Sequence, residues 1–285
     1  MHDRPHSHEA QMQRLRRLRI ALASGVLLSS AVLVALGVLA RAAYADNPAT
    51  PRLAALGPAH IQLPIAAPRK CPEEMAEIGG MFCVDRWEAT TELIGDHGER
   101  IADHSPFHMV IDEHVRAVSR PGVHPQGHIS RNEADLACQN AGKRLCTSKE
   151  WVEACRGPED QSFPYGNEHD PGACNDNQPS PLVKLYGKAP PPEHLGYHEM
   201  NHPGLNQQGG LALTGSFTRC ENGFGLSDMV GNLHEWTADK DGVFRGGYYR
   251  DTTQHGDGCR YKTTVHGPGY RDYSTGFRCC ADVAP

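Results

Sequence analysis

The chain has 285 residues, and the part before Cys71 lacks the pattern of a folded core, which leaves roughly 215 residues for one domain. Its formal net charge is −6, and its 17 histidines are spread along the sequence. This balance excludes a basic face of the kind that follows a phosphate backbone, so no nucleic-acid partner is expected.

The first element is an uncharged run from Ile20 to Ala40. As a helix it would be about 31 Å long, which matches the apolar core of a bilayer. Four arginines stand directly before it: Arg14, Arg16, Arg17 and Arg19. By the positive-inside rule, residues 1–19 would form a cytoplasmic tail, residues 20–40 a transmembrane signal anchor, and the rest would lie across the membrane.

A second interpretation of this segment stays open. Ala43-Tyr44-Ala45 fits a cleavage site near residue 45, so the apolar run is either a retained anchor or a removed signal peptide. Residues 46–70 are rich in proline and alanine and predict an extended linker, after which residues 71–285 would form the folded domain.

The chain contains ten cysteines, and none of them has Cys-x-x-Cys spacing. In an exported chain, an even number of cysteines favours disulfides over zinc thiolates or redox centres. The predicted location is therefore an oxidising compartment outside the cytoplasm, either periplasmic or extracellular, with the domain membrane-anchored or secreted.

The domain begins with a strand, a turn and a second strand, predicted from the alternation around Gly79-Gly80. Two helices follow a polar stretch. Ser130 with Glu133 predicts a capped helix that runs to about Ala141, and Thr147 with Glu150 predicts a second that runs to about Arg156. Residues 157–220 are dominated by Gly, Pro, Asn and Asp and predict a long loop region, which is normally functional or held by disulfides or metal.

Three blocks in the C-terminal part carry the most specific pattern. They are Asp228-Met-Val-Gly-Asn-Leu-His-Glu-Trp236, Phe244-Arg-Gly-Gly-Tyr248 and Gly276-Phe-Arg-Cys279. With Ala141-Gly-Lys-Arg-Leu145 before them, they resemble the sulfatase-modifying factor family, whose founding activity is formylglycine generation by oxidation of a sulfatase cysteine. The resemblance covers about Met75 to Asp282. It implies an α+β, loop-rich formylglycine-generating-enzyme fold related to C-type lectin domains.

The resemblance also implies disulfides. Cys138 matches the family's helix cysteine and would pair with Cys279, and Cys155 would then pair with Cys259. Local spacing favours Cys71 with Cys83. The pairs Cys174–Cys220 and Cys146–Cys280 are guesses, and other connectivities stay open.

Two structural calcium sites are implied as well. In the first, Asp228 and Glu235 would supply carboxylate oxygens and Gly231 and Leu233 backbone carbonyls, the hard ligands that calcium prefers. Asn175 and Asp176 match the start of the second. The alternative is that Asp228 and Glu235 are ordinary turn and helix-start residues.

The chain departs from the family at the active cysteines. The positions of the serine after Gly-Gly and of the first cysteine hold Tyr248 and Asp251, and the region of the second cysteine, residues 254–256, has none. Copper(I) needs soft thiolates, so copper is not expected. Cys259 has the spacing of the structural half-cystine and is not expected to be a nucleophile.

A candidate pocket remains, with His234, Tyr248, Asp251, His255 and His266. The leading hypothesis is an exported, disulfide-tied, calcium-stabilised domain that binds an unknown ligand or protein substrate. One alternative is an oxygen-dependent oxidoreductase that generates formylglycine in sulfatases. Another is a non-haem iron oxygenase, since two histidines and a carboxylate can hold iron.

Overall fold

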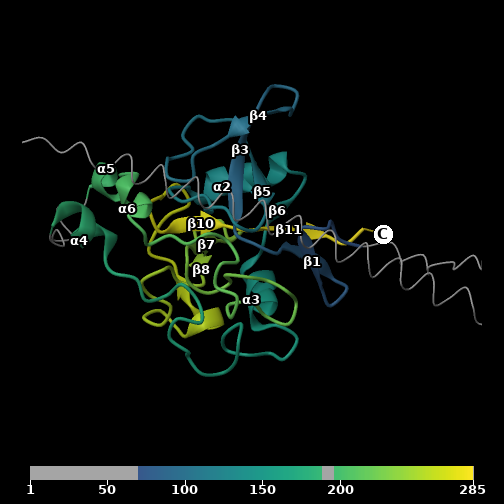
Figure 1. Ribbon diagram of the computed structural model, residues 1–285. Coiled ribbons are helices and arrows are strands. Elements are labelled where there is room, and N and C mark those ends of the chain that lie inside the picture. The colour runs from purple at the N-terminus through teal and green to yellow at the C-terminus, as the bar shows by residue number, and fades with distance from the viewer. Residues whose placement is uncertain (1–69, 188–195, 285) are drawn as a thin grey trace, which may run out of the picture. The chain divides into compact units, whose positions relative to one another are not determined.

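The computed structural model of the chain describes residues 70–187 and 196–284 (Figure 1). These residues belong to one compact unit, Ala66–Pro285. The predicted tail, the anchor or signal segment, and nearly all of the linker lie outside the described residues. Within the described ranges, no helix is both long enough and apolar enough to cross a membrane.

The two ends of the domain meet in one antiparallel sheet of order β1-β2-β11-β6. Its strands are β1 (Met75–Ile78), β2 (Phe82–Asp85), β11 (Cys279–Asp282) and β6 (Arg144–Leu145). Gly79 and Gly80 join β1 to β2 with φ angles of +57° and +75°, which glycine adopts without strain. The predicted N-terminal hairpin is therefore confirmed.

A second sheet is assembled mainly from the C-terminal sequence blocks, in the order β10-β7-β8-β9. Its strands are β10 (Thr275–Phe277), β7 (His234–Trp236), β8 (Phe244–Arg245) and β9 (Lys262–Thr263). Strands β10 and β7 run parallel, with His234 opposite Thr275 and Trp236 opposite Phe277. This pairing brings segments about forty residues apart to one place.

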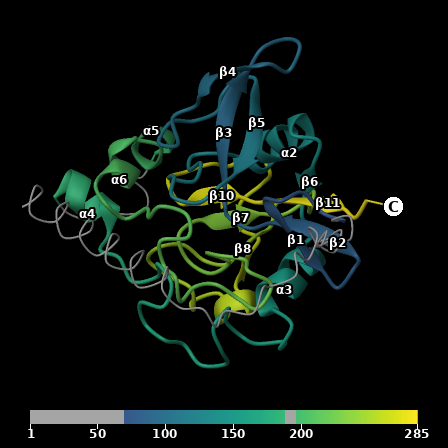
Figure 2. The same ribbon diagram turned by 45° about the vertical axis from the view of Figure 1, so that its right-hand side comes forward.

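The third sheet has the order β4-β3-β5 and lies beside helix α2. Its strands are β3 (Ala89–Ile94), β4 (Arg100–Asp103) and β5 (Val115–Ser119). Figures 1 and 2 both show β4 at the far edge of this sheet.

Both predicted helices are confirmed, together with their caps. Helix α2 spans Arg131–Asn140 and α3 spans Ser148–Arg156, and in each the N-cap hydroxyl and the glutamate three residues later make the reciprocal hydrogen bonds of a capping box. Their buried faces contribute to two core clusters, one around Trp151 and the other around Trp236. Cys138 and Cys155 lie on these buried faces.

The long loop region contains three short helices, α4 (Pro181–Tyr186), α5 (Tyr197–Met200) and α6 (Gly204–Gln207), and a 3-10 turn, η2 (Gly258–Arg260), follows later. Figures 1 and 2 both show α4, α5 and α6 on the side of the domain opposite β11. A disulfide between Cys174 and Cys220 joins two points of this region, and both cysteines lie in the core cluster around Trp151.

Five disulfides join all ten cysteines of the chain: Cys71–Cys83, Cys138–Cys279, Cys146–Cys280, Cys155–Cys259 and Cys174–Cys220. These are the pairs expected from the resemblance and from local spacing, including the two guesses. Disulfides in this number are typical of an oxidising, non-cytoplasmic compartment. The domain is a mixed α+β, loop-rich fold, as expected.

Candidate functional site

A pocket of ≈ 820 Å³ lies beside the second sheet. The structure brings all five candidate pocket residues to its lining: His234, Tyr248, Asp251, His255 and His266. They come from β7 and from the two loops that follow β8 and β9, and Tyr197 and Met200 of α5 also line the pocket. The pocket therefore collects side chains from segments far apart in the sequence.

A double-glycine turn after β8 aims Tyr248 and Asp251 at this pocket. Gly246 and Gly247 have φ angles of +82° and +72°. A Cβ atom at Gly247 would lie 2.3 Å from the carbonyl oxygen of Asp251, so only glycine fits. Tyr248 and Asp251 then exchange backbone N–H···O hydrogen bonds of 2.9 Å in both directions.

His234 lies among aromatic rings at the pocket wall. Its ring centroid is 4.4 Å from that of Phe244, 4.8 Å from Tyr248 and 5.4 Å from Tyr261. The residue is 6% exposed, and its Nδ1 atom is buried without a hydrogen-bond partner among the described residues. Burial, helped by the charges of His255 and His266, lowers the pKa of His234 to about 3, so the imidazole is neutral at physiological pH.

Asp251 is held by its own loop and by a phenol. Its Oδ1 accepts hydrogen bonds of 3.0 Å from the backbone N–H groups of Thr253 and Gln254. Its Oδ2 accepts a hydrogen bond of 3.0 Å from the hydroxyl of Tyr261. Burial and the neighbouring Asp251 raise the pKa of Tyr261 above its usual range, so this phenol stays a neutral donor.

A second acid of the pocket, Asp272, was missed by the sequence analysis. Its Oδ2 accepts from the hydroxyl of Tyr270 at 2.6 Å, and its Oδ1 accepts from the backbone and hydroxyl of Ser274 at 2.8 and 2.7 Å. Tyr273 follows it in the pocket lining. The sequence feature that could have pointed to Asp272 is its place between Tyr270 and Tyr273, just before the Gly276-Phe-Arg block.

Within the described residues, no three or more His, Cys, Asp or Glu side chains are grouped so that they hold a metal ion. His234, Asp251, His255 and His266 share the pocket, and iron binding by them stays a prediction.

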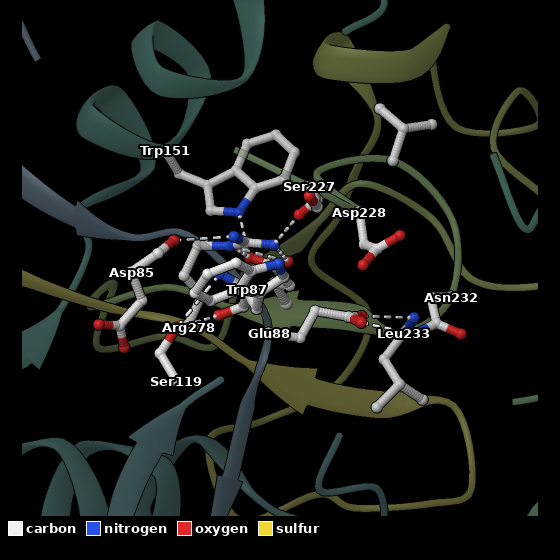
Figure 3. Close-up of polar contacts among 12 residues, drawn as sticks. Asp85, Trp87, Glu88, Ser119, Trp151, Ser227, Asp228, Asn232, Leu233 and Arg278 are labelled. Atoms are coloured by element: carbon white, nitrogen blue, oxygen red, sulfur yellow. Dashed lines mark hydrogen bonds and ion pairs between the residues drawn. The ribbon is translucent and has the colours of Figure 1, made fainter. Parts of the chain in front are cut away.

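The proposed calcium residues Asp228 and Glu235 are buried, and Figure 3 shows Asp228 and Leu233 near Glu88 and Asn232. Glu235 is 1% exposed and accepts hydrogen bonds from the guanidinium of Arg278 at 2.8–3.1 Å and from Nε1 of Trp151 at 2.7 Å. Asp228 is also buried and accepts from the backbone N–H of Gly215 at 2.6 Å. Burial raises the pKa of Asp228 to about 6.

Glu88 joins these acids and was also missed from sequence. It is fully buried and accepts hydrogen bonds from Nδ2 of Asn232 at 2.5 Å and from the backbone N–H of Leu233 at 3.0 Å. Burial, followed by the charges of Asp228 and Glu235, raises the pKa of Glu88 well above its usual range. Three buried carboxyls thus lie near one guanidinium, which forms its ion pair with Glu235, and the raised pKa values of Glu88 and Asp228 show that positive charge is scarce around them.

The two predicted calcium segments lie against each other. The carbonyl oxygen of Asn175 accepts from the N–H of Asn232, and the two side-chain amides form a hydrogen bond of 2.9 Å. Oδ1 of Asn175 and Oδ1 of Asp176 are buried without partners among the described residues. Orphaned hard oxygens of this kind fit a calcium ligand set. Gly231 packs tightly here, since a Cβ would lie 2.3 Å from the Asn175 carbonyl oxygen.

The sulfatase-modifying factor enzyme 1-like domain family matches residues 68–283. The chain is 32% identical over 188 residues to the formylglycine-generating enzyme of Mus musculus, covering 57% of this chain and 45% of that protein. It is also 32% identical over 170 residues to the inactive C-alpha-formylglycine-generating enzyme 2 of Bos taurus, covering 55% of this chain and 50% of that protein.

The chain therefore spans about half the length of these curated relatives. Among solved structures, PvdO from Pseudomonas aeruginosa is similar with a TM-score of 0.43 and 16% identity, covering 71% of this chain and 80% of that one.

Proposed function

The chain belongs to the family of sulfatase-modifying factor enzyme 1-like domains, and from this premise we propose that its pocket binds a ligand and does not oxidise cysteine thiols. The observation that carries the proposal is the state of the cysteines. All ten are paired in disulfides, and none of them lines the pocket.

The pocket chemistry supports the same conclusion. The positions that correspond to the family's serine and first active cysteine hold Tyr248 and Asp251, and both line the pocket. A copper(I) centre requires soft thiolates, whereas imidazole, phenol and carboxylate are harder groups. Cys259 is tied to Cys155, and a disulfide sulfur is neither a thiolate ligand nor a nucleophile.

Sequence identity does not decide between an active and an inactive relative. The formylglycine-generating enzyme of mouse and the inactive bovine relative are equally similar to this chain, at 32%. The substituted site residues are therefore the discriminating feature, because function depends on the site and not on the fold.

We also propose that structural calcium stabilises the domain. Asp228, Glu235 and the carbonyls of Gly231 and Leu233 would hold one ion, and Asn175 with Asp176 would begin a second ligand set. The excess of buried carboxyls and the orphaned oxygens of Asn175 and Asp176 support this proposal. Calcium would offset negative charge there and take no part in pocket chemistry.

The proposed location is outside the cytoplasm, periplasmic or extracellular. Five disulfides support an oxidising compartment. The apolar run of residues 20–40 would deliver the domain there as a membrane anchor or as a cleaved signal.

A copper(I) titration against a coloured chelator tests the loss of the thiol centre. We expect the purified, unreduced protein to leave copper(I) with the chelator, and a thiol reagent under denaturing conditions to find no free cysteine. Stoichiometric transfer of copper(I) to the native protein, abolished by Cys259→Ser, would overturn the proposal. Mild reduction followed by a repeat titration shows whether a labile disulfide conceals a thiol pair.

A further inference from the structure

We infer that the pocket takes an organic ammonium group, a deepening of the ligand-binding function proposed above and dependent on it. The walls of the pocket are rich in aromatic side chains. The rings of Phe244, His266 and Tyr270 form one near-parallel stack, with interplanar angles of 15° and 11°. Tyr248 and Tyr273 form another pair, with ring centroids 6.2 Å apart. Aromatic faces carry negative potential and attract cations within about 6 Å.

The pocket also contains carboxylates, whose negative charge attracts an ammonium group. Asp251 and Asp272 accept hydrogen bonds only from neutral groups, and within the described residues neither forms an ion pair. Of the two arginines in the lining, Arg271 is paired with Glu133 at 2.9 Å, and Arg250 is exposed. The interior therefore presents two carboxylates without a cationic partner.

Two phenols connect the acids to the aromatic walls. Tyr261 donates its hydroxyl to Asp251 at 3.0 Å, and Tyr270 donates to Asp272 at 2.6 Å. Donation to a carboxylate polarises the phenol and enriches its ring in electrons. The same contacts fix the ring orientations before a ligand arrives, which reduces the entropy lost on binding.

The unpartnered ring nitrogen of His234 is an independent observation that points to a ligand site. His234 is 6% exposed and lines the pocket, and its Nδ1 atom is buried without a hydrogen-bond partner among the described residues. Buried polar groups in native proteins normally have partners. A group that enters the pocket can supply the missing partner or pack against this ring between Phe244 and Tyr248.

Isothermal titration of the native domain with choline and with 3,3-dimethyl-1-butanol tests the inference, because the two ligands have nearly the same shape and differ in charge. We expect choline to bind at least about 10-fold more tightly than the neutral alcohol. Asp251→Asn keeps the size of the side chain and its loop hydrogen bonds, and should weaken choline by roughly 3- to 30-fold while leaving the alcohol unchanged. Asp257→Asn removes an exposed acid of the same loop that does not line the pocket, and should bind choline like the wild type.

Tyr248→Leu provides a second test that does not depend on Asp251, with thermal unfolding used to verify that each variant is folded. Equal affinity for choline and the neutral alcohol, no measurable binding of choline or tetramethylammonium, or an unaltered choline affinity in both pocket variants would overturn the inference. A peptide with trimethyllysine distinguishes a side-chain ligand from a free small molecule, and tighter binding of either one supports the ammonium assignment. Failure here leaves the proposed function standing, because copper(I) binding tests that function separately.

Discussion

The guanidinium of Arg278 and the carboxylate of Glu235 form an ion pair at 2.8 Å in which the two side chains are 0% and 1% exposed. Arg278 also donates to the backbone carbonyls of Asp85 and Ser227, each at 2.8 Å (Figure 3). It therefore joins β2, the loop before β7, and the junction of β10 and β11. The pair lies where the two ends of the domain meet.

Arg278→Met should lower the free energy of unfolding by about 3–5 kcal/mol, because Glu235 is then left buried without its partner. Urea unfolding followed by tryptophan fluorescence measures the loss. Arg100→Met is the matched control. Arg100 is exposed, and its two carboxylate partners, Glu92 and Asp103, each keep another arginine, so stability should change little. Equal losses in the two variants would contradict the assigned role of Arg278.

Removal of one disulfide should lower the free energy of unfolding more when that disulfide closes a longer loop. Cys138–Cys279 spans 141 residues and Cys71–Cys83 spans 12. Replacing both cysteines of the first pair by alanine should cost roughly 2 kcal/mol more than replacing both of the second, since a longer loop restricts the unfolded chain more. Unfolding in urea measures both variants, and peptide mapping without reductant verifies the connectivity. The reverse order, or a mapped Cys138 partner other than Cys279, contradicts the structure.

Calcium removal should lower the melting temperature. A ligand at about 100 times its Kd stabilises the native state by about 2.7 kcal/mol, which corresponds to roughly 5–10 °C for a domain of this size. Asp228→Asn should abolish most of the response to a chelator, while Asp257→Asn should keep it. Differential scanning calorimetry with and without the chelator makes the measurement, and a wild-type melting temperature indifferent to chelator excludes structural calcium.

The stability of the domain should fall in acid partly because of His128, which is fully buried. Its Nδ1 pairs with Oδ1 of Asn201 and its Nε2 with the amide of Asn206, an arrangement for a neutral ring. Burial lowers the pKa of His128 to about 4. Between pH about 6.5 and 4 the unfolded chain therefore binds more protons than the native state, so stability is lost as pH falls through this window.

When the pH falls from about 6.5 to 4, the free energy of unfolding of His128→Asn should decrease less than that of the wild type, by on the order of 3 kcal/mol. Asparagine tolerates the positive φ of +56° at this position, which limits backbone strain. Urea unfolding at a series of pH values measures the slope, with the exposed His97→Asn as control. Parallel pH profiles for wild type and His128→Asn would show that His128 does not titrate as described.

Local features of the sequence predicted local structure well. Ser130 with Glu133 and Thr147 with Glu150 mark both helix starts because the residues of each box are only three positions apart. The five disulfide pairs were also expected, two from the family spacing and the others from proximity or as guesses. The short helices α4 to α6 were not predicted, since they show too little periodicity over four to six residues.

The site was predictable only in part, for a physical reason. His234, Tyr248 and Asp251 belong to recognisable blocks, and the structure brings them together. Glu88 contacts Asn232 across 144 positions, and no local pattern encodes that distance. Asp272 was missed because the path of its loop is set by tertiary contacts, such as the ion pair of Arg271 with Glu133.

The most direct test of the account is incubation of the purified protein with a sulfatase-derived cysteine peptide, copper, oxygen and a reductant, with mass spectrometry of the peptide as the readout. The account predicts that no formylglycine forms, because Tyr248 and Asp251 stand where a thiol centre would be and every cysteine is held in a disulfide. An active formylglycine-generating enzyme serves as the positive control. Aldehyde product from this protein, lost in Cys259→Ser or Asp251→Ala, would contradict the central claim.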